Sequence, residues 1–296
     1  MPLITFDENR ERSEQDGSEW KFGAIETDLA LVPVKDRMLY TPQGVLQYNN
    51  VMDTNGCASR APLNILEAKL NWFYDNGMHP AIQTWMNEKG YRIDGKFVLC
   101  DAFIEILSGT TRSGNSLKAP VSALKSYGAI PAALIPLKDG MTWEQYMDRN
   151  RVTEEHLALG REFLARITLA YEQVSVSDFL NALEDDLLDV AGAAWPPPVN
   201  GVYPRNDGGF NHAFATVNPL IDALDNYQPF VKRLDPSYRF FDWGYQLSIT
   251  AQNPYPEALA TAYNAWKIFD LYGIVGSFAD YWARFTQALK GIIWRS

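Results

Sequence analysis

The stretch Gln47–Asn76, QYNNVMDTNGCASRAPLNILEAKLNWFYDN, places Cys57 directly after the turn-forming run DTNG and directly before an apolar helical pattern. The apolar positions follow the 3.6-residue period of a helix: Ala61, Ile65, Leu66, Leu70 and Phe73. A thiol at a helix N-terminus lies where unpaired N–H groups and the positive end of the helix dipole favour the nucleophilic thiolate. The alternative is a buried structural cysteine. Cys57 therefore needs partners elsewhere in the chain to act as a nucleophile.

The composition is that of one large domain, or of two lobes that share a core. The chain has 296 residues, 47% of them hydrophobic, and a formal net charge of −10. The negative charge argues against a nucleic-acid partner, because phosphate contacts need a basic surface. Two cysteines, Cys57 and Cys100, and three histidines form neither a disulfide framework nor a cysteine-based zinc site. We expect no metal and no cofactor.

The N-terminal sequence predicts no targeting segment. Residues 1–20 are charged and lack the apolar core of a signal peptide, so we expect none. The sequence also lacks a run of eighteen apolar residues, so no transmembrane segment is expected. The low cysteine content is typical of a reducing compartment.

A helix-rich half precedes a strand-rich half, which predicts an α+β arrangement with a cleft between two lobes. The predicted helices include one that Gly128 ends and a long one within 142–166. The later strand candidates are ITLAYEQVSV, LLDVAGAAW, HAFATVN, YQPFVKRLD and YQLSIT, with a short helix over 177–185. The predicted divisions are an N-terminal arm and extended segment (1–46), a helical lobe (47–166), a β-rich lobe (167–250) and an aromatic helical tail (251–296).

The strand-rich half supplies candidate partners for the cysteine. His212, in GGFNHAFATVN, begins a predicted strand 155 residues after Cys57. That separation is close to the roughly 130–150 residues between cysteine and histidine in one family of thiol peptidases. Asp235, in VKRLDPSY, follows on a later predicted strand. A cysteine, a histidine and an acid in this order indicate nucleophilic catalysis.

With these motifs the chain resembles the papain-like cysteine peptidases between about Gln47 and Ile249. The matching pieces are Gly-Cys-Ala-Ser, Gly-Gly-x-x-His-Ala and Leu-Asp-Pro-Ser-Tyr. The segments DTNGCAS, SGTTRSGNSL, SYGAIP and TWEQYM look like a divergent branch of that family encoded by bacteriophages and prophages. The resemblance implies a two-lobe α+β fold, with a helical N-terminal lobe, an antiparallel β-rich C-terminal lobe and additional C-terminal helices.

The resemblance also implies roles for individual residues. Cys57 would be the nucleophile, His212 the general base and then acid, and Asp235 the group that orients His212, where the family more often has Asn. The oxyanion donors would be the Cys57 N–H and the side chain of Gln47, although Gln47 lies farther upstream than usual. Two further candidates for the second donor stay open: Asn50 and Asn55.

Two residues depart from the family's usual nucleophile helix: Arg60 and Pro62. Proline lacks an N–H and is tolerated in the first helical turn. We therefore expect the helix to begin near Ser59, with Cys57 just before it. One alternative is a non-catalytic papain-fold virion structural or assembly protein. Another is a peptidoglycan amidase of the cysteine-histidine type, which the 155-residue gap disfavours.

The C-terminal tail carries an aromatic helical pattern over residues 256–294. These helices would either pack on the lobes or contact other virion or assembly proteins. As a phage-type peptidase, the protein would act on a peptide or protein substrate in the host cytoplasm or the virion.

Overall fold

The computed structural model describes residues 6–15, 32–42, 52–219, 222–224 and 231–251. The chain divides into two compact units, residues 1–252 and 253–296, and the second lies outside the described residues. The predicted tail helices therefore also lie outside them. The lobe boundaries predicted from the sequence stay a prediction, since both lobes fall within the first unit.

Helices predominate in the first part of the described chain and strands in the second. The helices are α1 (Glu8–Ser13), α2 (Val34–Tyr40), α3 (Cys57–Asn76), α4 (Pro80–Glu88), α5 (Asp101–Ser108), α6 (Lys118–Tyr127), α7 (Trp143–Tyr146), α8 (Glu154–Leu164) and α9 (Phe179–Asp185). The strands are β1 (Arg92–Ile93), β2 (Lys96–Phe97), β3 (Ile167–Ser175), β4 (Leu188–Gly192), β5 (Val202–Tyr203), β6 (His212–Thr216), β7 (Asp222–Leu224), β8 (Val231–Leu234) and β9 (Trp243–Ala251). This order confirms the predicted α+β class.

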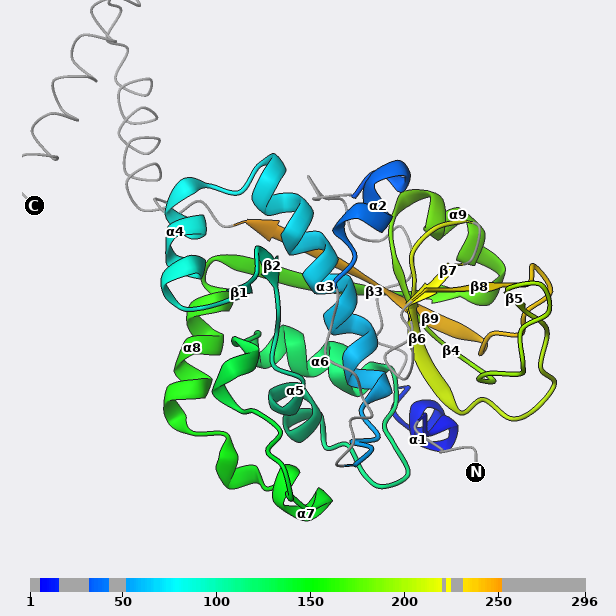
Figure 1. Ribbon diagram of the computed structural model, residues 1–296, viewed down its shortest axis with the longest axis horizontal. Helices are drawn as coiled ribbons and strands as arrows, with labels where there is room; N and C mark the ends of the chain where they lie inside the picture. Colours follow the sequence, from blue (N-terminus) through cyan, green and yellow to red (C-terminus); the bar gives the residue numbers. More distant parts are fainter. Residues whose placement is uncertain (1–5, 16–31, 43–51, 220–221, 225–230, 252–296) are drawn as a thin grey trace, which may run out of the picture. The chain divides into compact units, whose positions relative to one another are not determined.

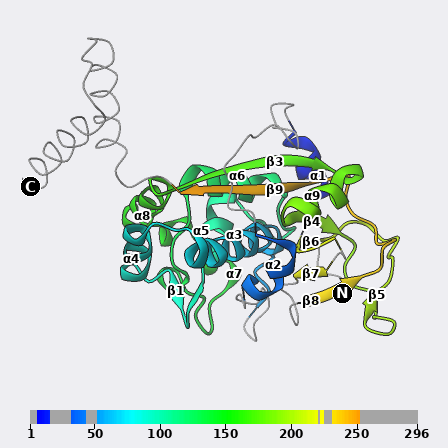
Figure 2. The same ribbon diagram turned by 90° about the horizontal axis from the view of Figure 1, so that it is seen from above.

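The main sheet has seven described strands in the order β3-β9-β4-β6-β7-β8-β5. All neighbours are antiparallel except β5 and β8. The two longest strands, β3 and β9, pair along their whole lengths and run side by side from the end of α8 to α9 (Figures 1 and 2). The strand that begins with His212 lies near the centre of the sheet, where it pairs with β4 and β7.

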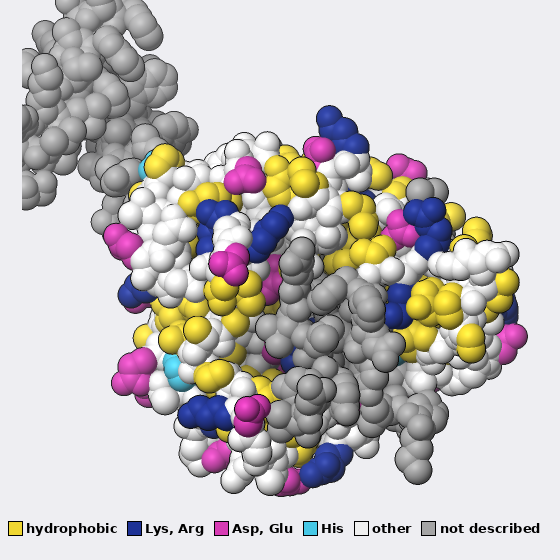
Figure 3. Space-filling view, viewed as in Figure 1, with side chains coloured by type: hydrophobic (Ala, Val, Ile, Leu, Met, Phe, Trp, Pro, Cys, Tyr) yellow, Lys and Arg dark blue, Asp and Glu magenta, His cyan; other side chains and the backbone are white. Residues whose placement is uncertain are grey.

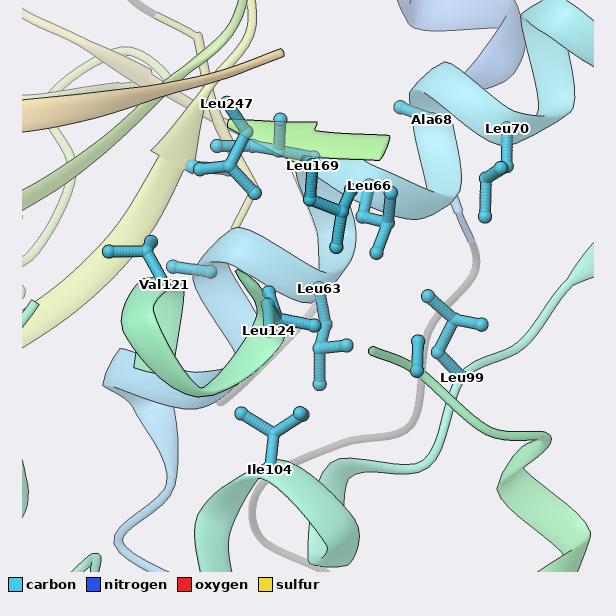
Figure 4. Close-up of a cluster of buried hydrophobic side chains, with 14 of the residues drawn as sticks. Leu63, Leu66, Ala68, Leu70, Leu99, Ile104, Val121, Leu124, Leu169 and Leu247 are labelled. Carbon is cyan, nitrogen blue, oxygen red and sulfur yellow. The ribbon is translucent and has the colours of Figure 1, made fainter. Parts of the chain in front are cut away.

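Helix α3 is the central element of the unit, and its residues from Cys57 to Asn71 are buried. It packs against β4, β6 and β9 on one side and against α5 and α6 on the other (Figure 1). Leu63 and Leu66 point into a core that also receives Leu124 from α6 and Leu169 from β3 (Figure 4). A helix that is buried on all sides is typical of the centre of a larger domain.

The start of α3 differs from the sequence expectation. The helix begins at Cys57, not near Ser59. The carbonyl of Gly56 already accepts the N–H groups of Ser59 at 2.9 Å and Arg60 at 3.0 Å, so the helical register is set before Ser59. The helix continues through Pro62, which is buried in its interior.

The segment predicted as an N-terminal arm and extended chain contains two docked helices. The buried Glu11 of α1 accepts hydrogen bonds from Trp243 Nε1 at 2.6 Å and the Tyr245 hydroxyl at 3.0 Å. In α2, the buried guanidinium of Arg37 donates to carbonyls at the end of α9, among them Glu184 at 3.1 Å and Asp186 at 3.2 Å. Contacts with residues far away in the sequence stabilise both short helices, and a local sequence pattern cannot predict such contacts.

The long helix predicted within 142–166 is broken in two. Thr142 and Thr153 each form a capping box, with Gln145 and His156 respectively, and each box begins a new helix. The helix expected over 177–185 is a 3-10 turn followed by α9. By contrast, α6 ends at Gly128 as predicted, where φ is +75°.

On the face in Figure 3, acidic and basic side chains are interspersed, so the negative net charge is not gathered into one patch there. None of the described helices combines the length and the apolar character that a membrane span needs.

Candidate active site

The candidate site begins at the N-terminus of α3. Cys57 is the first residue of this helix, and no acidic side chain lies in the first turn. The positive end of the helix dipole and the first N–H groups are therefore directed toward the thiol, without a carboxylate in that turn to offset them. The side chain of Cys57 is fully buried.

A hydrogen bond joins Cys57 to the strand that carries the predicted histidine. The Sγ atom accepts the backbone N–H of Ala213 at a distance of 3.3 Å. Ala213 is the second residue of β6 and directly follows His212. The fold thus places the sulfur against the backbone of β6, one residue after His212.

Small residues allow this close approach of α3 to the sheet. Ala61 of α3, Ala191 of β4, and Ala213 and Ala215 of β6 are all buried in the same core. Short side chains let the helix backbone come near the strands. The local alanine-rich sequence of β6 therefore contributes to the position of the sulfur.

His212 begins β6 and pairs with Gly192 of β4. Its ring is nearly buried and meets the edge of Trp195, with centroids 5.6 Å apart and planes at 82°. Phe214, two residues further along the strand, lies 6.1 Å from the ring centroid. Apolar rings thus limit the orientations that the imidazole can adopt.

Asp235 follows β8, and β7 lies between β8 and β6 in the sheet. Its N–H donates to the Tyr203 carbonyl at 2.9 Å. Its Oδ1 accepts the N–H of Ser237 at 2.8 Å and the Ser237 hydroxyl at 2.6 Å. The side-chain and backbone hydrogen bonds from Ser237 lower the pKa of Asp235 below its usual value. Its predicted role in orienting His212 stays a prediction.

The predicted oxyanion donors are only partly described. Gln47 and Asn50 lie outside the described residues. Asn55 adopts a left-handed conformation with φ of +57°, and its side-chain amide donates to the Arg112 carbonyl at 3.3 Å. The proposed donation by the Cys57 N–H also stays a prediction.

A buried acid near the site was not predicted. Asp189 lies on β4 in register with Ala215 of β6 and Tyr245 of β9. Neither carboxyl oxygen has a hydrogen-bond partner among the described residues. Burial raises the pKa of Asp189 well above its usual value, and the nearby Glu11 and Cys57 raise it further. In the sequence, Asp189 is the single acid within the otherwise apolar predicted strand LLDVAGAAW, and this was the feature that could have indicated it.

Cys100, the second cysteine, is a buried thiol of the core. It lies at the N-cap of α5, and its side chain is buried. Burial raises the pKa of Cys100 to about 12. Among the described residues, no group of three or more histidine, cysteine, aspartate or glutamate side chains could hold a metal ion.

The solved structures with partial similarity to this chain include two proteins. Xylellain, a cysteine protease from Xylella fastidiosa, is 13% identical with a TM-score of 0.45, over 81% of this chain and 94% of that one. A structure from a study of antibody cross-reactivity between the mite allergens Blo t 1 and Der p 1 is 9% identical with a TM-score of 0.44, over 81% of this chain and 76% of that one. No family model and no curated protein matches the chain.

Proposed function

We propose that the protein is a thiol peptidase or related amide hydrolase in which Cys57 is the nucleophile and His212 the general base and acid. The observation that carries this proposal is the 3.3 Å hydrogen bond from the Ala213 N–H to Cys57 Sγ. It holds a helix-terminal thiol against the strand residue next to His212. A nucleophile needs such a base within reach, and the sequence order of cysteine and histidine supports the same pairing.

The proposed reaction is acyl transfer. The Cys57 thiolate attacks the substrate carbonyl carbon and forms a tetrahedral intermediate, whose oxyanion the Cys57 N–H would stabilise. His212, having taken the thiol proton, donates it to the departing amine as the C–N bond breaks. Water, activated by His212, then hydrolyses the thioester. Asp235 would orient the imidazole throughout, as the sequence predicts.

The complete burial of Cys57 favours a second candidate function, which is a non-catalytic virion structural or assembly protein that keeps the fold. A substrate carbonyl reaches Sγ only after whatever covers the thiol moves aside. In the second candidate, the same hydrogen bond from Ala213 would satisfy a structural thiol.

A peptide-library experiment separates the two candidates. The full chain is incubated with peptides derived from a whole proteome, and new termini are identified by mass spectrometry. We expect cleavage by the wild-type protein and by Cys100→Ser, and none by Cys57→Ser. Cleavage that persists in Cys57→Ser, or no cleavage by any of the three proteins, contradicts the peptidase proposal.

The phage association rests on the sequence resemblance alone. We propose a phage or prophage origin, action in the host cytoplasm or the virion, and contact with other virion proteins through residues 251–296. Deletion of Pro256–Ser296 is the direct test of the tail. Loss of self-association or of particle incorporation with peptidase activity retained supports an assembly role, whereas unfolding of the truncated chain contradicts it.

A further inference from the structure

A buried cluster of charges lies beneath the turn that leads into Cys57. We name Arg60, Asp101 and Glu105 the Arg60 cluster. Arg60 Nη1 is 2.7 Å from Asp101 Oδ2, and Arg60 Nε is 3.4 Å from Glu105 Oε1. The side chains of Arg60 and Glu105 are 3% and 0% exposed. Arg60 is three residues after Cys57 on α3, whereas both acids come from α5.

Glu105 also contacts the turn itself. Its Oε1 accepts the Thr54 hydroxyl at 3.2 Å, and the Thr54 carbonyl accepts Trp143 Nε1 at 3.3 Å. A β-carbon built on Gly56 would lie 1.9 Å from Glu105 Oε1. The backbone directly before Cys57 therefore rests against this carboxyl group, and glycine is the residue that fits there.

The contacts with Arg60 and Thr54 are those of an ionised acceptor. Burial raises the pKa of Glu105 to about 7, while the facing Arg60 of α3 opposes that rise. The other groups that face Glu105 are Asp101 from its own helix and Tyr146 from α7. Arg60 thus forms ion pairs with both Asp101 and Glu105. Glu105 gains or loses its proton near neutral pH.

We propose that Glu105 is a positioning residue for Cys57: its ionised carboxylate, paired with Arg60, fixes Thr54 and Gly56 and so fixes the sulfur against Ala213, the neighbour of the proposed base His212. This inference rests on the proposed function, because it assumes that Cys57 is the nucleophile. Protonation of Glu105 removes the ion pair with Arg60 and one acceptor site for Thr54. The value of kcat should therefore depend on the protonation state of Glu105, although this side chain touches neither substrate nor His212.

Substitution of Glu105 tests this with a matched control. Glu105→Gln keeps the size of the side chain and removes its charge. Asp186→Asn removes the charge of another buried ion pair, in which Asp186 pairs with Lys69 of α3, twelve residues after Cys57. The fastest-cleaved peptide from the library, resynthesised with a fluorogenic reporter, provides kcat and KM per folded molecule between pH 5.5 and 8.5.

We expect Glu105→Gln to lower kcat by about 10- to 100-fold with little change in KM, as a displaced reacting group does. We also expect it to abolish a rise in wild-type kcat centred near pH 7, the value to which burial raises the pKa of Glu105. Asp186→Asn should keep the wild-type pH profile. Unchanged kcat and pH profile in Glu105→Gln overturn this inference alone, whereas full activity of Cys57→Ser overturns the proposed function.

Gly56→Ala provides a second test that removes no charge. Its new methyl group must displace the Glu105 carboxyl group, because φ at Gly56 is −94° and the backbone itself accepts alanine. We expect a loss of kcat similar to that of Glu105→Gln. Wild-type kcat in a folded Gly56→Ala protein contradicts the positioning role even if Glu105→Gln does not fold.

Discussion

Cys57 and Cys100 are alike in local structure and differ in what surrounds the sulfur. Both are buried free thiols at the start of a helix, α3 and α5 respectively. Cys57 Sγ faces the sheet and accepts the Ala213 N–H beside His212. Cys100 lies in the core, where burial raises its pKa to about 12. A helix N-terminus alone therefore does not distinguish the two thiols, whereas the element opposite each sulfur does.

The largest expected effect comes from His212, the proposed base for Cys57. Replacement of His212 by alanine should lower kcat/KM by about 10²- to 10⁴-fold, because general acid-base catalysis contributes that much. The measurement is steady-state cleavage of the library-derived peptide. His156→Gln, in the capping box of α8, is the matched control and should be nearly neutral. Equal activities of the two variants would remove His212 from the mechanism.

The two thiols should also differ in chemical reactivity. With its pKa at about 12, Cys100 has about one thiolate in 30,000 molecules at pH 7.5. We expect iodoacetamide to modify Cys57 at least about 100-fold faster in the folded protein, since the thiolate is the reacting form. Peptide mass spectrometry over time measures both rates, and His212→Ala should slow only that of Cys57. Equal rates for the two thiols in the wild-type protein would support the non-catalytic alternative.

The sequence predicted the elements that carry their own periodicity or stop signals. Helix α6 ends at Tyr127, directly before Gly128, as expected. The strand β6 that begins with His212 was also predicted. In each case the signal lies within a few residues of the element, which is the range that a local pattern can report.

The features that sequence analysis missed depend on contacts across the chain. Arg60 was noted only as a departure from a family pattern, whereas it pairs with acids more than 40 residues away. The docking of α1 through Glu11 involves residues 232 and 234 positions away. The raised pKa values of Glu105, Asp189 and Cys100 come mainly from burial, which is a property of the folded chain and has no local signature.

Glu105 contacts the turn before Cys57 and raises the pKa of Cys100, and it should make stability depend on pH. Burial raises its pKa from 4.5 to about 7, so the folded protein binds this proton more tightly than the unfolded chain. Its contribution to the free energy of unfolding is therefore complete below pH 4.5 and is lost as the pH rises to about 7 and above. The loss amounts to about 3 kcal/mol, because one pKa unit corresponds to about 1.4 kcal/mol.

Urea denaturation at pH 5 and pH 8 measures this contribution. Other buried acids also titrate, so the informative quantity is the difference between wild type and Glu105→Gln at each pH. Between pH 5 and pH 8, we expect the free energy of unfolding of Glu105→Gln to rise by up to about 3 kcal/mol relative to that of the wild type. The exposed control Glu155→Gln should leave the pH dependence nearly unchanged. A Glu105→Gln protein with the same pH dependence as wild type would show that Glu105 does not titrate in this range.

The smallest expected effect concerns Asp235, the proposed orienting group. Both hydrogen bonds from Ser237 end on Oδ1, and a carboxylate has a second oxygen with acceptor sites. A charge-assisted hydrogen bond from the imidazole to that oxygen would accelerate the reaction about tenfold. Asp235→Ala should therefore lower kcat/KM about tenfold, whereas Asp235→Asn, which keeps an acceptor oxygen, should lower it less. Ser237→Ala removes only the hydroxyl bond and is the control for the turn. If Asp235→Ala is no worse than Ser237→Ala, then Asp235 stabilises the turn after β8, and the group that orients His212 must be sought elsewhere in the chain.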